Sequence, residues 1–321
     1  MEKSLASGKD LKIKIIIGLL LVYVFWGGTY VAMKFAIQTI PPFITAGTRF
    51  TTAGLILYIV ERIKGSESPQ MIHWKKAAIV GLLMLLGGNG GVIWAQQVVP
   101  SGIAAIIAAT VPLWMTLIGW MFFGSRRPGG KIVFGLLLGF FGILLLVKNT
   151  GVIERNDITL LIGYAVILLA TFCWALGSIY SRTAQTPTSP LMGVALQMIC
   201  GGMGCLAASV ISGNWKGFDI MRVSMPSLIA FLYLVFFGSI IGFSAYIWLL
   251  RVANPTLVST YAYVNPIVAV FLAWLFAGER MSIFDLFAAM IILTAVVIIT
   301  KASGEQRAND PAKKAPIKAE A

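Results

Sequence analysis

The sequence predicts an all-α integral membrane protein in which ten transmembrane helices form two five-helix repeats of inverted topology, with both termini cytoplasmic. Three observations predict this fold class: the composition, the spacing of apolar runs, and an internal repeat. The chain of 321 residues is 58% hydrophobic and 12% charged, whereas a soluble domain carries about 25% charged residues. Because so few charges could not cover a soluble protein, lipid must surround most of the chain.

Apolar runs long enough to cross a bilayer recur along the chain. A spanning helix needs about 20 mainly apolar residues. Helices fit these runs better than barrel strands, because barrel strands alternate apolar and polar residues and the run 132–147 does not. Short polar breaks separate ten runs, of which the second and fifth are short: 13–34, 43–61, 76–98, 102–123, 131–148, 159–181, 190–211, 227–250, 256–277 and 283–301.

The first run has the basic start and apolar core of a signal peptide. It continues directly into the sequence WGGTYVAMK, without the small-residue pattern of a cleavage site. We therefore expect a retained first helix, preceded by a cytoplasmic segment of residues 1–12.

The loops between the runs carry an uneven charge that orients the chain. Lys and Arg concentrate in the cytoplasmic loops of membrane proteins. If the N-terminus is cytoplasmic, 18 of the 25 basic residues lie inside, 6 lie outside, and Arg49 lies within a run. Both termini are therefore predicted to be cytoplasmic. The formal charge of +13 resides mainly in these loops, so it does not indicate a nucleic-acid partner.

An internal repeat divides the chain into two halves. Tryptophan and proline recur in register, 154 residues apart in the later runs of each half and 148 residues apart in the earlier ones. Tryptophan is rare, with nine in the chain, so its matched pairs carry the most weight. The matched positions are Gly88 and Gly242, Trp94 and Trp248, Pro112 and Pro266, Trp120 and Trp274, Phe122 and Phe276, Gly124 and Gly278, Arg126 and Arg280, then Trp26 and Trp174, Lys34 and Arg182, Pro42 and Pro190, and Gly54 and Gly202.

The repeat sets the expected domain boundaries. The first five-helix repeat covers 13–148, a linker loop covers 149–158, the second repeat covers 159–301, and a disordered cytoplasmic tail covers 302–321. Because five is odd, the second repeat must enter the membrane from the opposite side. Transporters commonly use such inverted repeats, with the substrate near the midplane at their interface. Channels are duplicated too, so duplication alone does not establish transport.

The stretch WGGTYVAMKFAIQTIPPFITAGTRF, residues 26–50, resembles the opening of the EamA-type branch of the drug/metabolite transporter superfamily. The residues that carry the resemblance are Trp26-Gly27, Lys34, Pro42 and Arg49-Phe50. The closing turn Gly278-Glu279-Arg280 also matches the family pattern.

The resemblance covers about residues 14–301 but departs from the family at one position. Ser125 stands in the first half where glutamate is usual, so any role of that acid applies only to Glu279. The resemblance implies a multi-pass transporter of the cytoplasmic (inner) membrane. Such transporters are often exporters of metabolites or amino acids, with ten helices.

An ionisable side chain within a span marks a functional site by default. Arg49 lies within the second span. It acts there either in function, by contacting a substrate carboxylate or by gating, or in structure, by capping backbone carbonyls or by snorkelling to an interface. No Asp or Glu lies in the middle of a span. The sequence therefore favours neutral, zwitterionic or anionic small-molecule substrates. It offers no evident proton relay, because His73 is placed in a cytoplasmic loop.

Polar and aromatic residues within the spans are predicted to line a substrate cavity. Amide side chains in a dry environment need partners, so they should face a cavity or another helix. Tryptophans in the middle of a span are not explained by the interfacial aromatic belt. The predicted cavity residues are Trp26, Tyr30, Arg49, Asn89, Trp94, Gln97, Trp174, Tyr246, Tyr261 and Asn265.

Two further sets of residues are predicted to act in conformational change. Pro112 and Pro266 lie inside predicted spans at matched positions, where each allows a kink, so we expect either paired hinges or inert kinks. Lys34, Arg182 and Glu279 are the predicted gating or anchoring residues.

Other classes of function find little support in the sequence. The three cysteines lack metal or redox spacing, and neither a metal nor a cofactor is predicted. One histidine and no carboxylate cluster argue against a membrane enzyme. The sequence shows no filter-like repeat or charged ring of a channel, but a passive facilitator or channel stays open as an alternative, as does a lipid flippase.

Besides the small-molecule substrate, membrane lipid is the expected partner. The oligomeric state stays open, with a monomer among the options.

Overall fold

The computed structural model describes residues 8–99, 104, 107–148, 158–184, 187, 189–277 and 283–308. Their regular structure is helical, and no β-strand occurs among them. In chain order the elements are α1 (Gly8–Ala36), α2 (Pro42–Ile63), α3 (Met71–Gly81), the π-helix η1 (Leu82–Gly90), α4 (Gly91–Ala95), α6 (Val111–Phe122), α7 (Gly130–Lys148), α8 (Ile158–Ser181), α9 (Pro190–Ile211), the 3₁₀ turn η2 (Ile220–Arg222), α10 (Met225–Tyr233), the π-helix η3 (Leu234–Phe243), α11 (Ser244–Val252), α12 (Pro255–Val258), α13 (Tyr261–Ala277) and α14 (Ile283–Ala308).

Six helical segments of the described chain are long and apolar enough to cross a membrane. They are Asp10–Ala36, Pro42–Ile63, Met71–Ala95, Ile158–Ser181, Pro190–Ile211 and Met225–Val252. Shorter apolar helices occur at Val111–Phe122, Gly130–Gly142 and Leu286–Ala302. The described part of the chain is therefore all-helical with the apolar spans of a membrane protein, while the count of ten spans remains a prediction.

Helices α2 and α9 show how local sequence sets matched boundaries in the two halves. Each begins with proline at its first position, where the missing N–H costs nothing. After each helix a glycine adopts positive φ, Gly65 at 83° and Gly213 at 69°, as suits a residue just past a helix C-terminus. Both helices therefore start and stop 148 residues apart, which is the offset between the matched prolines.

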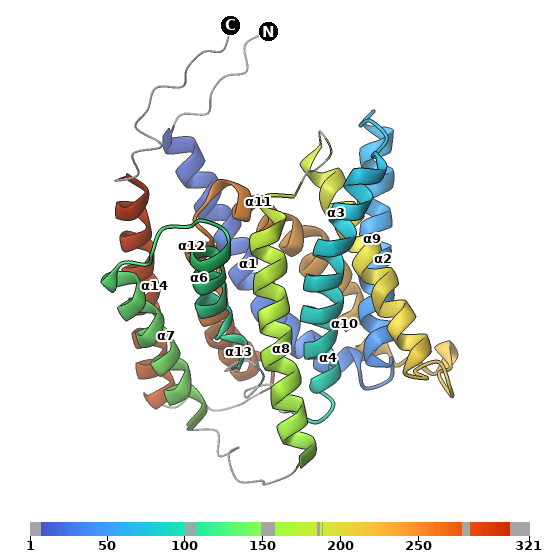
Figure 1. The fold of residues 1–321 in the computed structure, drawn as a ribbon. Helices are drawn as coiled ribbons and strands as arrows, with labels where there is room; N and C mark the ends of the chain where they lie inside the picture. The colour runs from blue at the N-terminus through green and yellow to red at the C-terminus, as the bar shows by residue number, and fades with distance from the viewer. Residues whose placement is uncertain are drawn as a thin grey trace, which may run out of the picture.

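The helices of one half pack against those of the other in matched pairs. Helix α2 packs against α9, and α7 packs against α14. Helix α1 packs along α10, η3 and α11, just as α8 packs along α3, η1 and α4. In Figure 1, α1 begins and α14 ends at the same end of the molecule, whereas α8 begins at the opposite end. Such opposed directions are what an inverted repeat requires.

The contact between α2 and α9 depends on small residues. A Cβ atom added to Gly202 would lie 2.6 Å from the backbone nitrogen of Thr51, and one added to Gly54 would lie 2.9 Å from the carbonyl oxygen of Ala195. Small residues let helix backbones approach closely where lipid gives no hydrophobic drive between helices. The matched glycines Gly54 and Gly202 thus lie in the contact between the two halves.

The structure corrects several predicted boundaries. Helix α14 continues to Ala308, so residues 302–308 are helical and the tail prediction now concerns only 309–321, outside the described residues. Helix α1 begins at Gly8, inside the predicted N-terminal segment. The linker loop also lies outside the described residues, apart from residue 158, which begins α8.

The predicted proline hinges differ from each other in the structure. Pro266 lies inside α13, as predicted. Pro112 lies in the first turn of α6, where proline fits without a kink. Residues 109–110 form a turn just before α6, so Pro112 lies at a helix start, and its role as a hinge remains a prediction.

Candidate functional site

A central cavity lies between the two halves and has a volume of about 80 Å³. Its walls come from α1 and α2 of the first half, α8 and α13 of the second half, and the interrupted helices of both. Pockets for drug-sized ligands enclose roughly 300–1,000 Å³. In this conformation the cavity therefore suits only a small solute.

Irregular helix segments at corresponding places in the two halves line this cavity. The π-helix η1 contributes Gly88 and Asn89, and the π-helix η3 contributes Gly238 and Phe243. A turn at residues 109–110 interrupts the chain before α6, and a turn at 259–260 lies between α12 and α13. Lining residues lie on both sides of the first turn and directly after the second. Because π-helical turns and broken helices are frequent at functional sites, the cavity is the strongest candidate site.

One wall of the cavity is an aromatic cluster around Trp26. The ring of Trp26 lies 4.9 Å from Tyr261 and 5.5 Å from Trp174, both edge-on. Its indole N–H donates to the carbonyl oxygen of Gly238 at 2.9 Å. The indole N–H of Trp174 donates to the hydroxyl of Tyr246 at 3.2 Å. These bonds fix the rings, so the wall is rigid and mostly apolar.

Arg49 brings a buried positive charge to the cavity and is 3% exposed. Its Nε–H donates to the hydroxyl of Ser239 at 2.7 Å, and its guanidinium lies 4.5 Å from the ring centre of Phe50. Within the described part of the chain, Nη1 has no hydrogen-bond partner and no carboxylate pairs with the guanidinium. The guanidinium is therefore positioned but only partly satisfied.

Two asparagines add neutral polar groups to the same cavity. Asn89 lies in η1 and Asn265 in α13, and both line the cavity. The Oδ1 atom of each is buried and lacks a hydrogen-bond partner among the described residues. Buried polar atoms are normally hydrogen-bonded, so the unsatisfied atoms of Arg49, Asn89 and Asn265 on the walls of one cavity are candidates to contact a polar ligand.

The structure brings together seven of the ten predicted cavity residues: Trp26, Tyr30, Arg49, Asn89, Trp174, Tyr261 and Asn265. The other three do not line the cavity in this structure. Gln97 is exposed and donates to the carbonyl of Trp94, which packs in a separate apolar cluster. Tyr246 is fully buried behind Trp26 and Trp174 rather than lining the cavity.

Sequence reasoning missed several lining residues, including Thr29, Met33, Phe50, Thr171 and Phe243. The sequence does carry a signal for Thr29 and Met33. Together with Trp26 and Tyr30 they occupy positions spaced by three or four residues, which is one face of an α-helix. The other three are ordinary apolar or hydroxyl residues in membrane spans, with no feature of composition to single them out.

Two of the predicted gating residues, Lys34 and Arg182, do not line the cavity. Lys34 is exposed in the last turn of α1. Arg182 follows α8, and its Nε–H donates to the carbonyl of Leu250 at 2.9 Å, which joins the end of α8 to α11. Glu279 lies outside the described residues. The structure thus gives Arg182 a bridging contact and Lys34 an exposed position.

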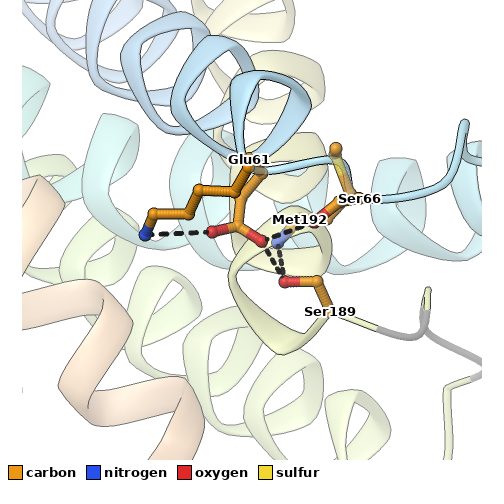
Figure 2. Close-up of polar contacts among 5 residues, drawn as sticks. Glu61, Ser66, Ser189 and Met192 are labelled. Carbon is orange, nitrogen blue, oxygen red and sulfur yellow. Dashed lines mark hydrogen bonds and ion pairs between the residues drawn. The ribbon is translucent and has the colours of Figure 1, made fainter.

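A second buried charge, Glu61, lies at the end of α2 and joins the two halves (Figure 2). Its carboxylate accepts hydrogen bonds from Ser66 at 3.0 Å and from Ser189, and it lies 3.7 Å from the ammonium of Lys64. Ser189 in turn caps α9 by accepting from the backbone N–H of Met192. All the groups around Glu61 thus have partners, which indicates a structural role.

Membrane-spanning helices in two halves around a central polar and aromatic cavity define the architecture of a membrane transport protein. The chain belongs to the EamA-like transporter family, whose model matches residues 13–148 and again residues 161–301. The resemblance seen in the sequence is thereby confirmed. The family model matches twice, within two residues of the expected start and end of each repeat.

Relatives at several levels of identity are named as transporters. The chain is 38% identical over 283 residues to the uncharacterized inner membrane transporter YedA of Escherichia coli, over 87% of this chain and 88% of that protein. It is 24% identical to a probable amino-acid metabolite efflux pump of Escherichia coli, over 87% of this chain and 92% of that protein. These names indicate a transporter rather than an enzyme, and they support the predicted multi-pass inner-membrane location.

A solved crystal structure shares the fold. It superposes with a TM-score of 0.74 at 17% sequence identity and covers 93% of this chain and 99% of that chain. At this identity the likeness concerns the arrangement of helices alone.

Proposed function

We propose that the protein is a secondary transporter that moves small metabolites such as amino acids out of the cytoplasm by alternating access. The observation that carries this proposal is the central cavity, which irregular helix segments of both halves line at corresponding places. In secondary transporters the substrate sits between two repeats, where helices are interrupted. Membrane lipid surrounds the bundle.

The size of the cavity supports a mechanism with more than one conformation. A volume of about 80 Å³ lies well below the range of common ligand pockets. The cavity must therefore enlarge toward one side of the membrane to admit a solute. Rocking of one half against the other achieves this, and opposite rocking opens the other side.

The opposed directions of the two halves support an inverted repeat (Figure 1). The start of α1 and the end of α14 lie at one end of the molecule, as expected if both termini are cytoplasmic. The excess of basic residues in the loops at that end sets the orientation. A reporter that is active only outside the cytoplasm should stay inactive when it is fused to the C-terminus.

The charge of the cavity supports neutral, zwitterionic or anionic substrates. Its described lining contains no Asp or Glu, and Arg49 supplies a positive charge. A cation would meet this charge without a counter-ion. The relative named as a probable amino-acid metabolite efflux pump supports metabolites of the amino-acid class and the outward direction.

Counterflow in proteoliposomes tests the proposal. Vesicles are loaded in turn with a neutral, aromatic, acidic or basic amino acid, and uptake of the labelled compound is followed. A carrier should give saturable uptake that depends on the internal solute. Flux without saturation would indicate a passive facilitator, and movement of labelled lipid in place of solute would indicate a flippase. Either result would overturn the carrier proposal.

Two neighbouring residues of α8 provide a matched pair of variants. Ala170 lines the cavity and is 1% exposed, whereas Leu169 is 62% exposed. Ala170→Phe should fill the cavity and reduce counterflow at least about tenfold, a loss that corresponds to roughly 1.4 kcal/mol. Leu169→Phe should leave counterflow unchanged. Equal counterflow in both variants would place the substrate path elsewhere.

A further inference from the structure

We propose that Arg49, Asn89 and Asn265 together recognise both charged ends of a small solute that carries a carboxylate and a protonated amino group. Nη1 of Arg49 donates to the carboxylate, and the Oδ1 atoms of the two asparagines accept from the ammonium group. This inference rests on the proposed transport function and names the recognition groups of its substrate.

The first step is that Arg49 is held in place while one of its guanidinium nitrogens, Nη1, is buried without a partner among the described residues. Ser239 accepts from Nε, and Phe50 lies under the guanidinium. Nη2 faces Gly238 so closely that an added Cβ there would lie 2.8 Å away. Of the three guanidinium nitrogens of Arg49, only Nη1 is buried without a hydrogen-bond partner among the described residues. A planar guanidinium with a free N–H suits a carboxylate.

The second step is that the unsatisfied acceptors lie around the same cavity. Asn265 is 2% exposed, and its Oδ1 has no partner in the described part of the chain. The same holds for Oδ1 of Asn89. An ammonium group has three donors and no acceptor, so it selects the oxygen of each amide. One buried donor and two buried acceptors therefore match the two ends of a zwitterion.

The third step is that the cavity rejects either end alone. An amine without a carboxylate would meet the charge of Arg49, with no acidic residue in the described lining to offset it. A carboxylate without an amine would leave both asparagine oxygens unsatisfied, which costs binding energy. The aromatic wall of Trp26, Trp174 and Tyr261 adds apolar contact, so neutral apolar side chains suit the remaining space.

Binding to the purified protein in detergent tests this inference separately from transport. The probes are L-alanine, L-serine, L-threonine, L-valine, L-leucine and L-phenylalanine, each beside its amide and its deaminated acid. Quenching of tryptophan fluorescence reports binding, since Trp26 and Trp174 line the cavity. At least one amino acid should bind at least about tenfold more tightly than both of its analogues, as expected when a charged group loses its partner.

Three variants separate recognition from general damage. Arg49→Gln should weaken the bound amino acid at least about tenfold. Asn265→Leu removes one of the two acceptors, so it should lower affinity for the amino acid toward that for its deaminated acid, whose own affinity should not fall. Gln197→Leu is the matched control: Gln197 is the repeat counterpart of Arg49, and its buried Oε1 lacks a partner among the described residues, but it does not line the cavity. It should bind as the wild type does.

Each contrary outcome has a distinct meaning. If none of the six amino acids binds while another solute shows saturable counterflow, the inference fails and the transport function stands. If amino acids bind as expected but no counterflow occurs, the recognition site stands and the transport function fails. Unchanged affinity in Arg49→Gln, or equal losses for the amino acid and its deaminated acid in Asn265→Leu, would overturn the assignment of the two ends.

Discussion

Arg49 and Glu61 are both buried charged residues of α2, but they differ in how far the protein satisfies them. Glu61 is 5% exposed and has Ser66, Ser189 and Lys64 as partners. Arg49 is 3% exposed, and its Nη1 atom lacks a partner among the described residues. A buried charge is costly unless it is paired and hydrogen-bonded.

The difference separates a structural charge from a functional one. Around Glu61 the protein supplies the partners itself, so removal of the carboxylate must leave other groups unsatisfied. Around Arg49 the protein positions the charge, but Nη1 has no partner among the described residues, so we expect a ligand to supply one. We therefore expect stability to depend on Glu61 and solute recognition on Arg49.

The largest effect on stability is expected for Glu61→Ala. The change removes the acceptor for Ser66 and Ser189 in a buried contact between α2 and α9, and hydrogen bonds to charged groups contribute about 1.5–3 kcal/mol. The free energy of unfolding should fall by about 2–3 kcal/mol, as measured by denaturation in mixed micelles. Glu67→Ala, at an exposed position, should have no effect. Stability equal to that of the wild type in Glu61→Ala would remove the structural role.

A smaller loss is expected for Ser189→Ala. The variant loses the cap of α9 and one donor to Glu61, and loss of a cap costs about 0.5–2 kcal/mol. The same unfolding measurement should show a decrease of about 1–2 kcal/mol. Because the two residues are in direct contact, the loss should be smaller in a Glu61→Ala background. Additive losses would mean that the two side chains act independently.

A change near zero is expected for Arg49→Met, although the residue is more buried than Glu61. Loss of the bond to Ser239 is offset because an incompletely paired guanidinium no longer has to be desolvated. The free energy of unfolding should change by less than about 1 kcal/mol, while amino-acid binding is lost. A decrease as large as that of Glu61→Ala would show that Arg49 is structural and would reverse the comparison.

The smallest effect is expected for Lys64→Ala. The ammonium lies 3.7 Å from Glu61, and the lysine side chain is 63% exposed. Exposed ion pairs contribute about 0–1 kcal/mol, so the free energy of unfolding should change by no more than about 0.5 kcal/mol. Addition of salt should reproduce this small change in the wild type. A larger loss would show that Lys64, rather than the two serines, satisfies Glu61.

Much of the helical framework could be predicted from particular residues. The predicted span 190–211 coincides with α9, and the span 43–61 lies within α2, because proline starts and glycine stops are local signals. The break before α6 is not visible in the hydropathy of residues 102–123, which are mostly apolar, although Pro112 offers the same start signal as the prolines of α2 and α9. Hydropathy alone thus predicts Pro112 inside a span, whereas the helix begins at Val111.

The three predicted cavity residues that lie elsewhere share a physical reason. Trp94 and Gln97 follow the π-helix η1, and Tyr246 follows the π-helix η3. Hydrogen bonds of the π type join residues five apart instead of four, so the direction of later side chains shifts from that of a regular α-helix. Polarity and position within a span predicted these three residues, and neither property reports on which face of the helix a side chain lies.

The sequence by itself determined the membrane environment, the approximate spans, the duplication of the chain and the presence of a charge within the second span. These properties depend on composition and on local or periodic patterns. Only the tertiary structure decided which buried charge is satisfied. Glu61 finds Ser189, 128 residues away, whereas Arg49 reaches Ser239, 190 residues away, and keeps Nη1 without a partner in the described chain. Hydrogen bonds between distant residues depend on how the halves pack, and no local pattern in either half encodes them.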